Sequence, residues 1–385
     1  MGVSTWARDR WVLLTIIGVL STLLVASPIY AAVNSSIPKS VGSTSTIELI
    51  SNVATGHDPS SVVYNPSNNQ MYVANEGSSS VYALNATTNA LLYTIGVSSK
   101  PIAEVFDPAN DNVYVADYGT DKVSVISPAD TAPTSLKVAD EPITLLYDPA
   151  NTEVLSAGFN SGNVSAINST TGAVTELAGF DDPVSMVYDT ANGDVYALNY
   201  GNFTATVINS KDVVVGWITF SDTCGNPGEL AYDPSNQTVW YSDCYANQID
   251  VVSGTSIVAQ VSVTSGGSQA APGITTLVYD PSSGNMYLAG TTANVVSLIT
   301  SKTYKVTNIP MGSEPGAIGY DPDDKEMFVS CYGSAEVTAI LVTSVNTQLT
   351  IVSTKASPGP MAYDPVQSSM WITDYGSASV STLAS

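Results

Sequence analysis

The chain has 385 residues and a net charge of −23, from 11 basic and 34 acidic side chains, yet only 12% of its residues are charged. This composition argues against a surface that binds nucleic acid, because phosphate contacts need clustered Lys and Arg. A hydrophobic content of 44% argues against charge-driven disorder. The single histidine, His57, excludes a metal site built from several histidines.

The N-terminus has the pattern of an export signal. Arg8 and Arg10, the only arginines, precede an apolar stretch of 16 residues at 11–26, and small residues follow at 31 and 32. We expect residues 1–32 to be a signal peptide or, as the alternative, an uncleaved membrane anchor. Residues 33–45 have the composition of a linker. The remaining residues, 46–385, form one predicted domain outside the cytoplasm, extracellular or at the cell surface.

That domain repeats one motif eight times. Each unit has a short apolar run, a Tyr-Asp-Pro triplet or close variant, and two or three further strand-like segments. The aromatic residues of the triplets are separated by 41 to 47 positions, at 64, 106, 147, 188, 232, 279, 320 and 363. Four short antiparallel strands in about 42 residues are typical of a propeller blade. The Asp-Pro pair predicts the turn between the first two strands.

The two ends of the domain predict how the ring closes. The last unit has room for only three strands, and residues 46–53 read as the missing fourth one. Closing the ring with that strand would remove open sheet edges. We therefore expect an all-β fold, a β-propeller of eight four-stranded blades. Seven blades is the alternative if the weak unit at 183–219 is distorted.

The segments 71–75, 113–119 and 327–333 read Met-Tyr-Val-Ala-Asn, Val-Tyr-Val-Ala-Asp-Tyr-Gly and Met-Phe-Val-Ser-Cys-Tyr-Gly. They resemble the YVTN β-propeller repeat, and the resemblance covers about residues 46–385. It implies a propeller of the kind found in archaeal and bacterial exported and surface-layer proteins, whose usual blade number is seven. It implies little about activity, because propellers host both enzymes and binding modules.

Acidic and amide residues recur at two positions of the repeat. One position precedes the proline that opens each blade, and the other ends the second strand, so we expect both to lie at one mouth of the central channel. Carboxylates converging there could hold Ca²⁺ or another divalent cation. The alternative is that they hydrogen-bond their own loops. The predicted binding set is His57, Asp58, Asp117, Glu141, Asp182, Asp243, Glu314 and Asp374.

Two modifications fit an exported chain. Cys224 and Cys244 fall in loops expected at one end of the same blade, so we predict a disulfide between them, with Cys331 left over and free buried thiols as the alternative. Six Asn-x-Ser/Thr triplets predict glycosylation. They start at Asn34, Asn85, Asn163, Asn168, Asn202 and Asn236.

The sequence thus predicts an exported cell-surface propeller, of archaeal type, that binds, adheres or builds a surface layer without catalysis and without a required cofactor. Expected partners are other surface proteins or glycans, including copies of itself, with membrane contact only through the N-terminal segment. The alternative is a lyase- or lactonase-like propeller enzyme that uses an acidic channel mouth and a divalent cation. Sparse lysines among many carboxylates also suggest an acidic habitat, where most carboxylates are neutral.

Overall fold

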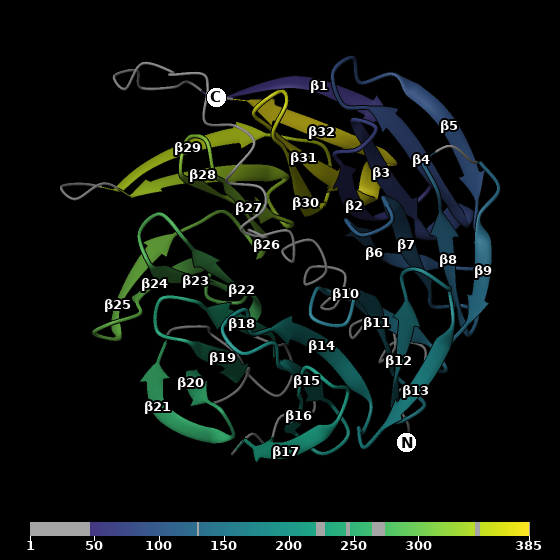
Figure 1. Ribbon diagram of the computed structural model, residues 1–385. Helices are drawn as coiled ribbons and strands as arrows, with labels where there is room; N and C mark the ends of the chain where they lie inside the picture. The colour runs from purple at the N-terminus through teal and green to yellow at the C-terminus, as the bar shows by residue number, and fades with distance from the viewer. Residues whose placement is uncertain are drawn as a thin grey trace, which may run out of the picture.

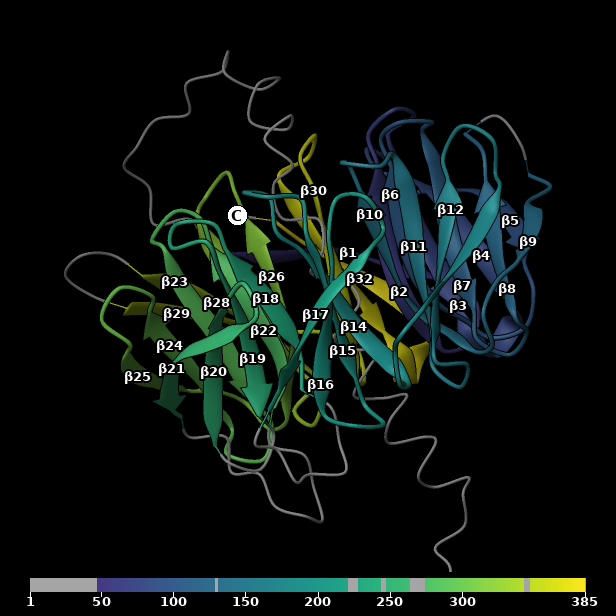
Figure 2. The ribbon, with the colours of Figure 1, turned by 60° about the horizontal axis from the view of Figure 1, so that its bottom comes forward.

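The computed structural model describes residues 47–128, 131–220, 228–243, 247–263, 274–342 and 347–384. Within these ranges lie eight four-stranded antiparallel sheets and two short 3₁₀ turns, η3 (Glu76–Ser78) and η4 (Tyr375–Ser377). Figure 1 shows the sheets arranged as blades around a central axis, and Figure 2 shows the same ring from a tilted view. The chain is an eight-bladed β-propeller, as its repeats predict. No helix within those ranges has the length and apolarity needed to cross a membrane.

Each of the first four blades is a run of four consecutive strands that begins at the channel and ends at the rim. Blade 1 contains β2 (Pro59–Asn65), β3 (Gln70–Asn75), β4 (Ser80–Asn85) and β5 (Leu91–Gly96). Blade 2 contains β6 (Pro101–Asp107), β7 (Asn112–Asp117), β8 (Lys122–Ile126) and β9 (Thr134–Lys137). Blade 3 contains β10 (Pro142–Asp148), β11 (Glu153–Gly158), β12 (Asn163–Asn168) and β13 (Val174–Ala178). Blade 4 contains β14 (Pro183–Tyr188), β15 (Val195–Asn199), β16 (Thr204–Ile208) and β17 (Val214–Thr219).

The next three blades follow the same order, and the eighth takes its outer strand from the N-terminal side. Blade 5 contains β18 (Leu230–Asp233), β19 (Thr238–Asp243), β20 (Gln248–Ser253) and β21 (Ser256–Ser262). Blade 6 contains β22 (Ile274–Asp280), β23 (Asn285–Gly290), β24 (Val295–Thr300) and β25 (Lys305–Pro310). Blade 7 contains β26 (Pro315–Asp321), β27 (Glu326–Cys331), β28 (Glu336–Val342) and β29 (Thr347–Ser353). Blade 8 contains β30 (Pro358–Asp364), β31 (Ser369–Asp374), β32 (Ser379–Ala384) and β1 (Glu48–Ala54).

The ring closes through the predicted N-terminal strand. β1 pairs antiparallel with β32, from Glu48 opposite Ala384 to Ala54 opposite Ser379. The weak unit at 183–219 forms a regular sheet, β14 to β17, so the blade number is eight rather than the alternative of seven.

Burial falls from the channel side to the rim of each blade. Every residue of β2 and β6 is buried, whereas β1 and β29 are mostly exposed. A strand covered on both faces needs apolar or small residues throughout, while a rim strand alternates with polar residues. This gradient explains why the inner strands read as continuous apolar runs in the sequence.

Large aromatic side chains fill the space between blades. Tyr72, Tyr196, Tyr287, Phe328 and Trp371, all in second strands, are almost fully buried. Tyr64 of blade 1 belongs to one cluster with Trp371 of blade 8, so this packing also joins the first and last blades. Such buried rings contribute a large share of the hydrophobic stabilisation of the fold.

Candidate functional site

At one end of the ring, here called the mouth end, a backbone hydrogen bond joins two loops in six of the blades that the structure describes there. The residue before the blade-opening proline has a left-handed backbone with φ between 53° and 60° at Asp58, Lys100, Glu141, Asp182, Glu314 and Ser357. Its carbonyl accepts the N–H of the residue that follows the second strand, at 2.9 Å for Asp58 and Glu76 and 3.0 Å for Glu141 and Phe159. What recurs at this position is therefore a backbone conformation and a backbone hydrogen bond. The side chain takes no part in either and can differ between blades.

The predicted residues that end the second strands are buried. Asp117 accepts a hydrogen bond from Ser124 (2.6 Å) and Asp374 accepts one from Ser381 (2.7 Å), both in the third strand of their own blade. Burial raises the pKa of both carboxyls to about 6, and the serine hydroxyls oppose this. These two carboxylates point into their blades rather than converging at the mouth. Asp243 ends β19, and its side chain lies outside the described residues.

The other predicted residues lie on the surface of the mouth end. His57 and Glu314 are exposed, and Asp58, Glu141 and Asp182 are half-buried. The His57 backbone N–H donates to Ser78 Oγ at 3.1 Å. Burial and the neighbouring Asp181 raise the pKa of Asp182. The predicted set is thus distributed around the ring, with two members in blade 1, one in each of blades 2 to 5, 7 and 8, and none in blade 6.

A set of aromatic residues lies at the same end, directly after the second strands. Its members are Tyr118, Phe159, Tyr200, Tyr332 and Tyr375, here called the aromatic arc. Tyr332 is 39% exposed, and the other four are half-buried. Phe159 and Tyr200, from neighbouring blades, have ring centroids 5.8 Å apart. The sequence contains a signal for this set, because an aromatic residue directly follows the second strand in five of the eight units.

The aromatic arc contacts two charged residues between blades 2 and 3, of which Glu141 belongs to the predicted set and Lys100 does not. The Tyr118 hydroxyl donates to Glu141 Oε2 at 3.3 Å. Lys100 Nζ lies 6.0 Å from the centroid of the Tyr118 ring, within cation–π range. A carboxylate, an ammonium group and an aromatic ring therefore lie together here. Tyr118, which is not in the predicted set, contacts both charged groups.

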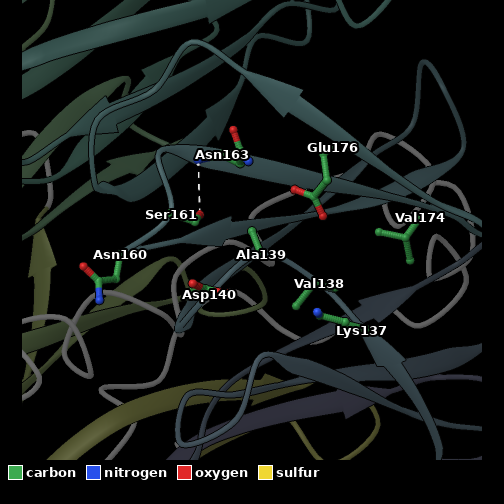
Figure 3. A pocket seen from close by; sticks show the side chains of 9 residues that line it. All are labelled: Lys137, Val138, Ala139, Asp140, Asn160, Ser161, Asn163, Val174 and Glu176. Atoms are coloured by element: carbon green, nitrogen blue, oxygen red, sulfur yellow. Dashed lines mark hydrogen bonds between the residues drawn. The ribbon is translucent and has the colours of Figure 1, made fainter.

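A polar groove of about 590 Å³ lies between the outer parts of blades 2 and 3. Figure 3 shows its lining, in which Ser161 Oγ accepts a 3.2 Å hydrogen bond from the Asn163 backbone N–H. Lys137, Asp140 and Glu176 contribute charges of both signs. The groove was not predicted because it combines an outer strand with a connection between blades, the parts of the repeat that vary most.

At the opposite end, here called the turn end, the Tyr-Asp-Pro aspartates form the turns predicted for them. In all eight blades the side-chain oxygen accepts the backbone N–H two residues later, at 2.8–2.9 Å. Asn65 takes this role in blade 1. The position is conserved across the repeat because the turn needs an acceptor there.

The predicted modification sites are partly described. Cys224, Cys244 and Asn34 lie outside the described residues, and Cys331 is a buried thiol whose pKa burial raises to about 11. Asn202 is exposed, as is Asn236, whose amide nitrogen donates to Asp233 Oδ2 at 3.1 Å. Asn85, Asn163 and Asn168 are half-buried, and Asn85 and Asn168 accept hydrogen bonds within their own turns.

Comparison with known proteins identifies the fold and no family. No protein-family model and no curated protein matches the chain. Among solved structures, Sqt1 of Saccharomyces cerevisiae is similar over 88% of this chain and 99% of its own, at 12% identity and a TM-score of 0.74. The C-terminal WD40 domain of Sif2 covers 89% of this chain and 99% of its own, at 11% identity and a TM-score of 0.69.

An enzyme is also among the similar structures. Catalytically inactive virginiamycin B lyase from Staphylococcus aureus, solved with quinupristin, covers 74% of this chain and 94% of its own, at 12% identity and a TM-score of 0.59. Identities this low establish a shared β-propeller fold alone, since one fold hosts many activities. The resemblance to the YVTN repeat therefore stays a prediction.

Proposed function

We propose that the protein is an exported cell-surface β-propeller that binds glycans or glycosylated surface proteins at its mouth end, without catalysis. The aromatic arc is the observation that carries this proposal. Five aromatic side chains in equivalent positions of five blades remain partly exposed at one end of the molecule. Partly exposed tyrosines offer an apolar face together with a polar hydroxyl, which is the combination found at binding surfaces.

The chemistry around the arc fits a saccharide. Sugars present apolar C–H faces and many hydroxyls, so they need flat apolar partners beside hydrogen-bond acceptors. Glu141, Asp182 and Glu314 carry carboxylates in the loops that hydrogen-bond the backbone of the arc. The acidic net charge of −23 disfavours acidic glycans and favours neutral or basic ones.

The rim of the propeller supports a scaffold role. Ten exposed large hydrophobic residues lie in outermost strands: Leu49, Ile50, Leu91, Leu92, Tyr93, Val215, Trp217, Val258, Leu349 and Ile351. An outermost strand also presents one unpaired backbone edge, to which another strand can add. Lateral association with other copies or other surface proteins would cover both features.

Binding of the full chain to neutral oligosaccharides on a glycan array tests the proposal, with affinities then measured by calorimetry. Phe159→Ala together with Tyr200→Ala should weaken binding by about tenfold or more, as expected for aromatic contacts. Tyr93→Ala is the matched control, because Tyr93 is 48% exposed but lies at the rim in β5. Equal loss in both variants, or no binding to any neutral glycan, would contradict the proposal.

The enzyme alternative is separable by activity. The similarity to a lyase of the same fold is the observation that favours it. A lyase or lactonase would turn over a substrate and lose its rate with His57→Ala or with chelation of a cation at the mouth. A binding module would keep its affinity for the glycan after both changes.

A further inference from the structure

Three acidic side chains meet between blades 3 and 4 at the turn end. Asp148 ends β10, Glu153 begins β11, and Asp212 lies in the hairpin between β16 and β17 of the next blade. One oxygen from each lies within 4.8 Å of the others. Asp148 is 2% exposed and Glu153 is 6% exposed, while Asp212 is half-buried. The three carboxyls thus share a largely dehydrated space.

A second observation is independent of this proximity. Glu153 Oε1 is buried and has no hydrogen-bond partner. A buried carboxylate oxygen without a partner is costly, because it has lost its contact with water. A cation at the centre of the cluster would supply the missing partner.

Two further groups, the Ala150 backbone N–H and the Asn151 amide, contact the carboxylates of the cluster. The backbone N–H of Ala150 holds Asp148 Oδ1 at 2.8 Å. The Asn151 amide nitrogen donates to Asp212 Oδ1 at 2.7 Å and to Asp148 Oδ2 at 3.2 Å, so this amide bridges the two blades. Turning the amide by half a rotation would present its oxygen to the same space, since the two ends of an amide are nearly equal in shape.

We propose that Asp148, Glu153 and Asp212, with the Asn151 amide oxygen, bind one Ca²⁺ ion that joins blades 3 and 4. Three carboxylates and an amide give at least four oxygen ligands, and water completes the six to eight that Ca²⁺ takes. Two of the donors come from turns, which suits the flexible geometry of Ca²⁺ better than the strict octahedron of Mg²⁺. This site is at the opposite end from the mouth, so it is independent of the proposed glycan binding.

Blade 7 offers a natural comparison. Asp321 and Glu326 occupy the positions of Asp148 and Glu153, and Glu326 is 5% exposed with Oε2 unpartnered. Blade 8 contributes no counterpart of Asp212, because its fourth strand is β1 and no hairpin connects it to β32. Among the described residues, the blade 3–4 cluster is the one group that brings three such oxygens together. The site therefore depends on Asp212.

The test is calorimetric titration of the full chain, stripped with EDTA and dialysed, with CaCl₂ and separately with MgCl₂. We expect one Ca²⁺ per chain with a dissociation constant in the range of about 10⁻⁴ to 10⁻³ M, typical of extracellular modules, and weaker Mg²⁺ binding. Terbium luminescence gives a second measurement, because Tyr147 directly precedes Asp148 in the chain and can sensitise the ion.

Asp212→Asn should weaken Ca²⁺ binding by about tenfold or more, because it replaces a charged ligand with a neutral amide of nearly the same shape. Glu326→Gln, at the matched position of blade 7, should leave it unchanged. An absence of Ca²⁺ binding, equal binding by wild type and Asp212→Asn, or tighter binding of Mg²⁺ than of Ca²⁺ would each overturn the proposal. Circular dichroism and thermal unfolding without metal establish that both variants are folded, so loss of binding is not loss of structure.

Discussion

The two ends of the propeller use aspartate in different ways. At the turn end, each aspartate accepts a backbone N–H from its own turn, and the residue is Asp or Asn in all eight blades. At the mouth end, Asp117 and Asp374 accept hydrogen bonds from serine side chains of the third strand. The equivalent positions in other blades hold Asn75, Gly158 and Cys331.

This difference shows what keeps a residue constant in a repeat. A backbone donor is present in every blade, so the acceptor that it needs is present in every blade too. A side-chain donor can be lost together with its acceptor, which lets both positions drift. A residue that is the same in every blade therefore indicates a structural role in a turn. The residues at the mouth end differ between blades, so they can form a binding site.

The largest expected effect is that the protein loses stability as the pH rises from about 4 to 7. Burial raises the pKa of Asp117, Asp374 and Asp321 to about 6 and that of Glu326 to about 7. The folded state then binds these protons more tightly than the unfolded state, so their contribution is complete below the unfolded pKa values near 4 and is lost through pH 6 to 7. A pKa of about 6 in place of 3.8 corresponds to roughly 3 kcal/mol for each carboxyl. Urea unfolding across this range measures the effect.

Variants at the mouth end and at the turn end separate the contributions of their buried carboxyls to the pH dependence of stability. Asp117→Asn should flatten the profile near pH 6, and Glu326→Gln should flatten it near pH 7. Ser124→Ala removes the hydroxyl that lowers the pKa of Asp117, so the loss of stability should move to higher pH. A stability maximum well above pH 6 in the wild type would refute both this interpretation and the predicted acidic habitat.

A smaller effect tests the turn end alone. Asp107 is fully buried and its Oδ1 accepts the Ala109 N–H at 2.9 Å, so Asp107→Ala should lower the free energy of unfolding by about 2 kcal/mol. Asp107→Asn should retain most of the stability, because Asn65 makes the same bond in blade 1. Urea unfolding at pH 5 measures both. Equal losses in the two variants would show that charge, rather than the acceptor for the turn, sets this position.

Most of the fold could be predicted from the sequence because each repeat contains the pattern of its own strands and turns. The period near 42, the Asp-Pro turns and the strand at 46–53 predicted eight blades and the closure through β1 and β32. These features are local, since a turn or a half-buried strand leaves its pattern in adjacent residues.

The site was less predictable because the direction of a side chain depends on contacts with residues of other strands and other blades. The carboxylates of Asp117 and Asp374 share a repeat position with candidate mouth residues, yet they turn into their blades towards serines seven residues away. The cluster of Asp148, Glu153 and Asp212 joins neighbouring blades across 64 residues, and its members have different positions in the repeat. A search for equivalent residues finds rings of like side chains and misses clusters that form at one blade interface.

The smallest expected effect concerns the contact between Tyr118 and Glu141 at the mouth end. Tyr118→Phe removes a 3.3 Å hydrogen bond at the surface but keeps the ring beside Lys100, so the cost should be below about 1 kcal/mol. Tyr118→Ala should cost no more in stability at pH 5 than Asp107→Ala, yet it should weaken glycan binding, because it removes a member of the aromatic arc. Urea unfolding and calorimetry on the same samples separate the two effects. If Tyr118→Ala destabilises the fold more than Asp107→Ala does, the aromatic arc serves to hold blades together, and the mouth end is structural in the same sense as the turn end.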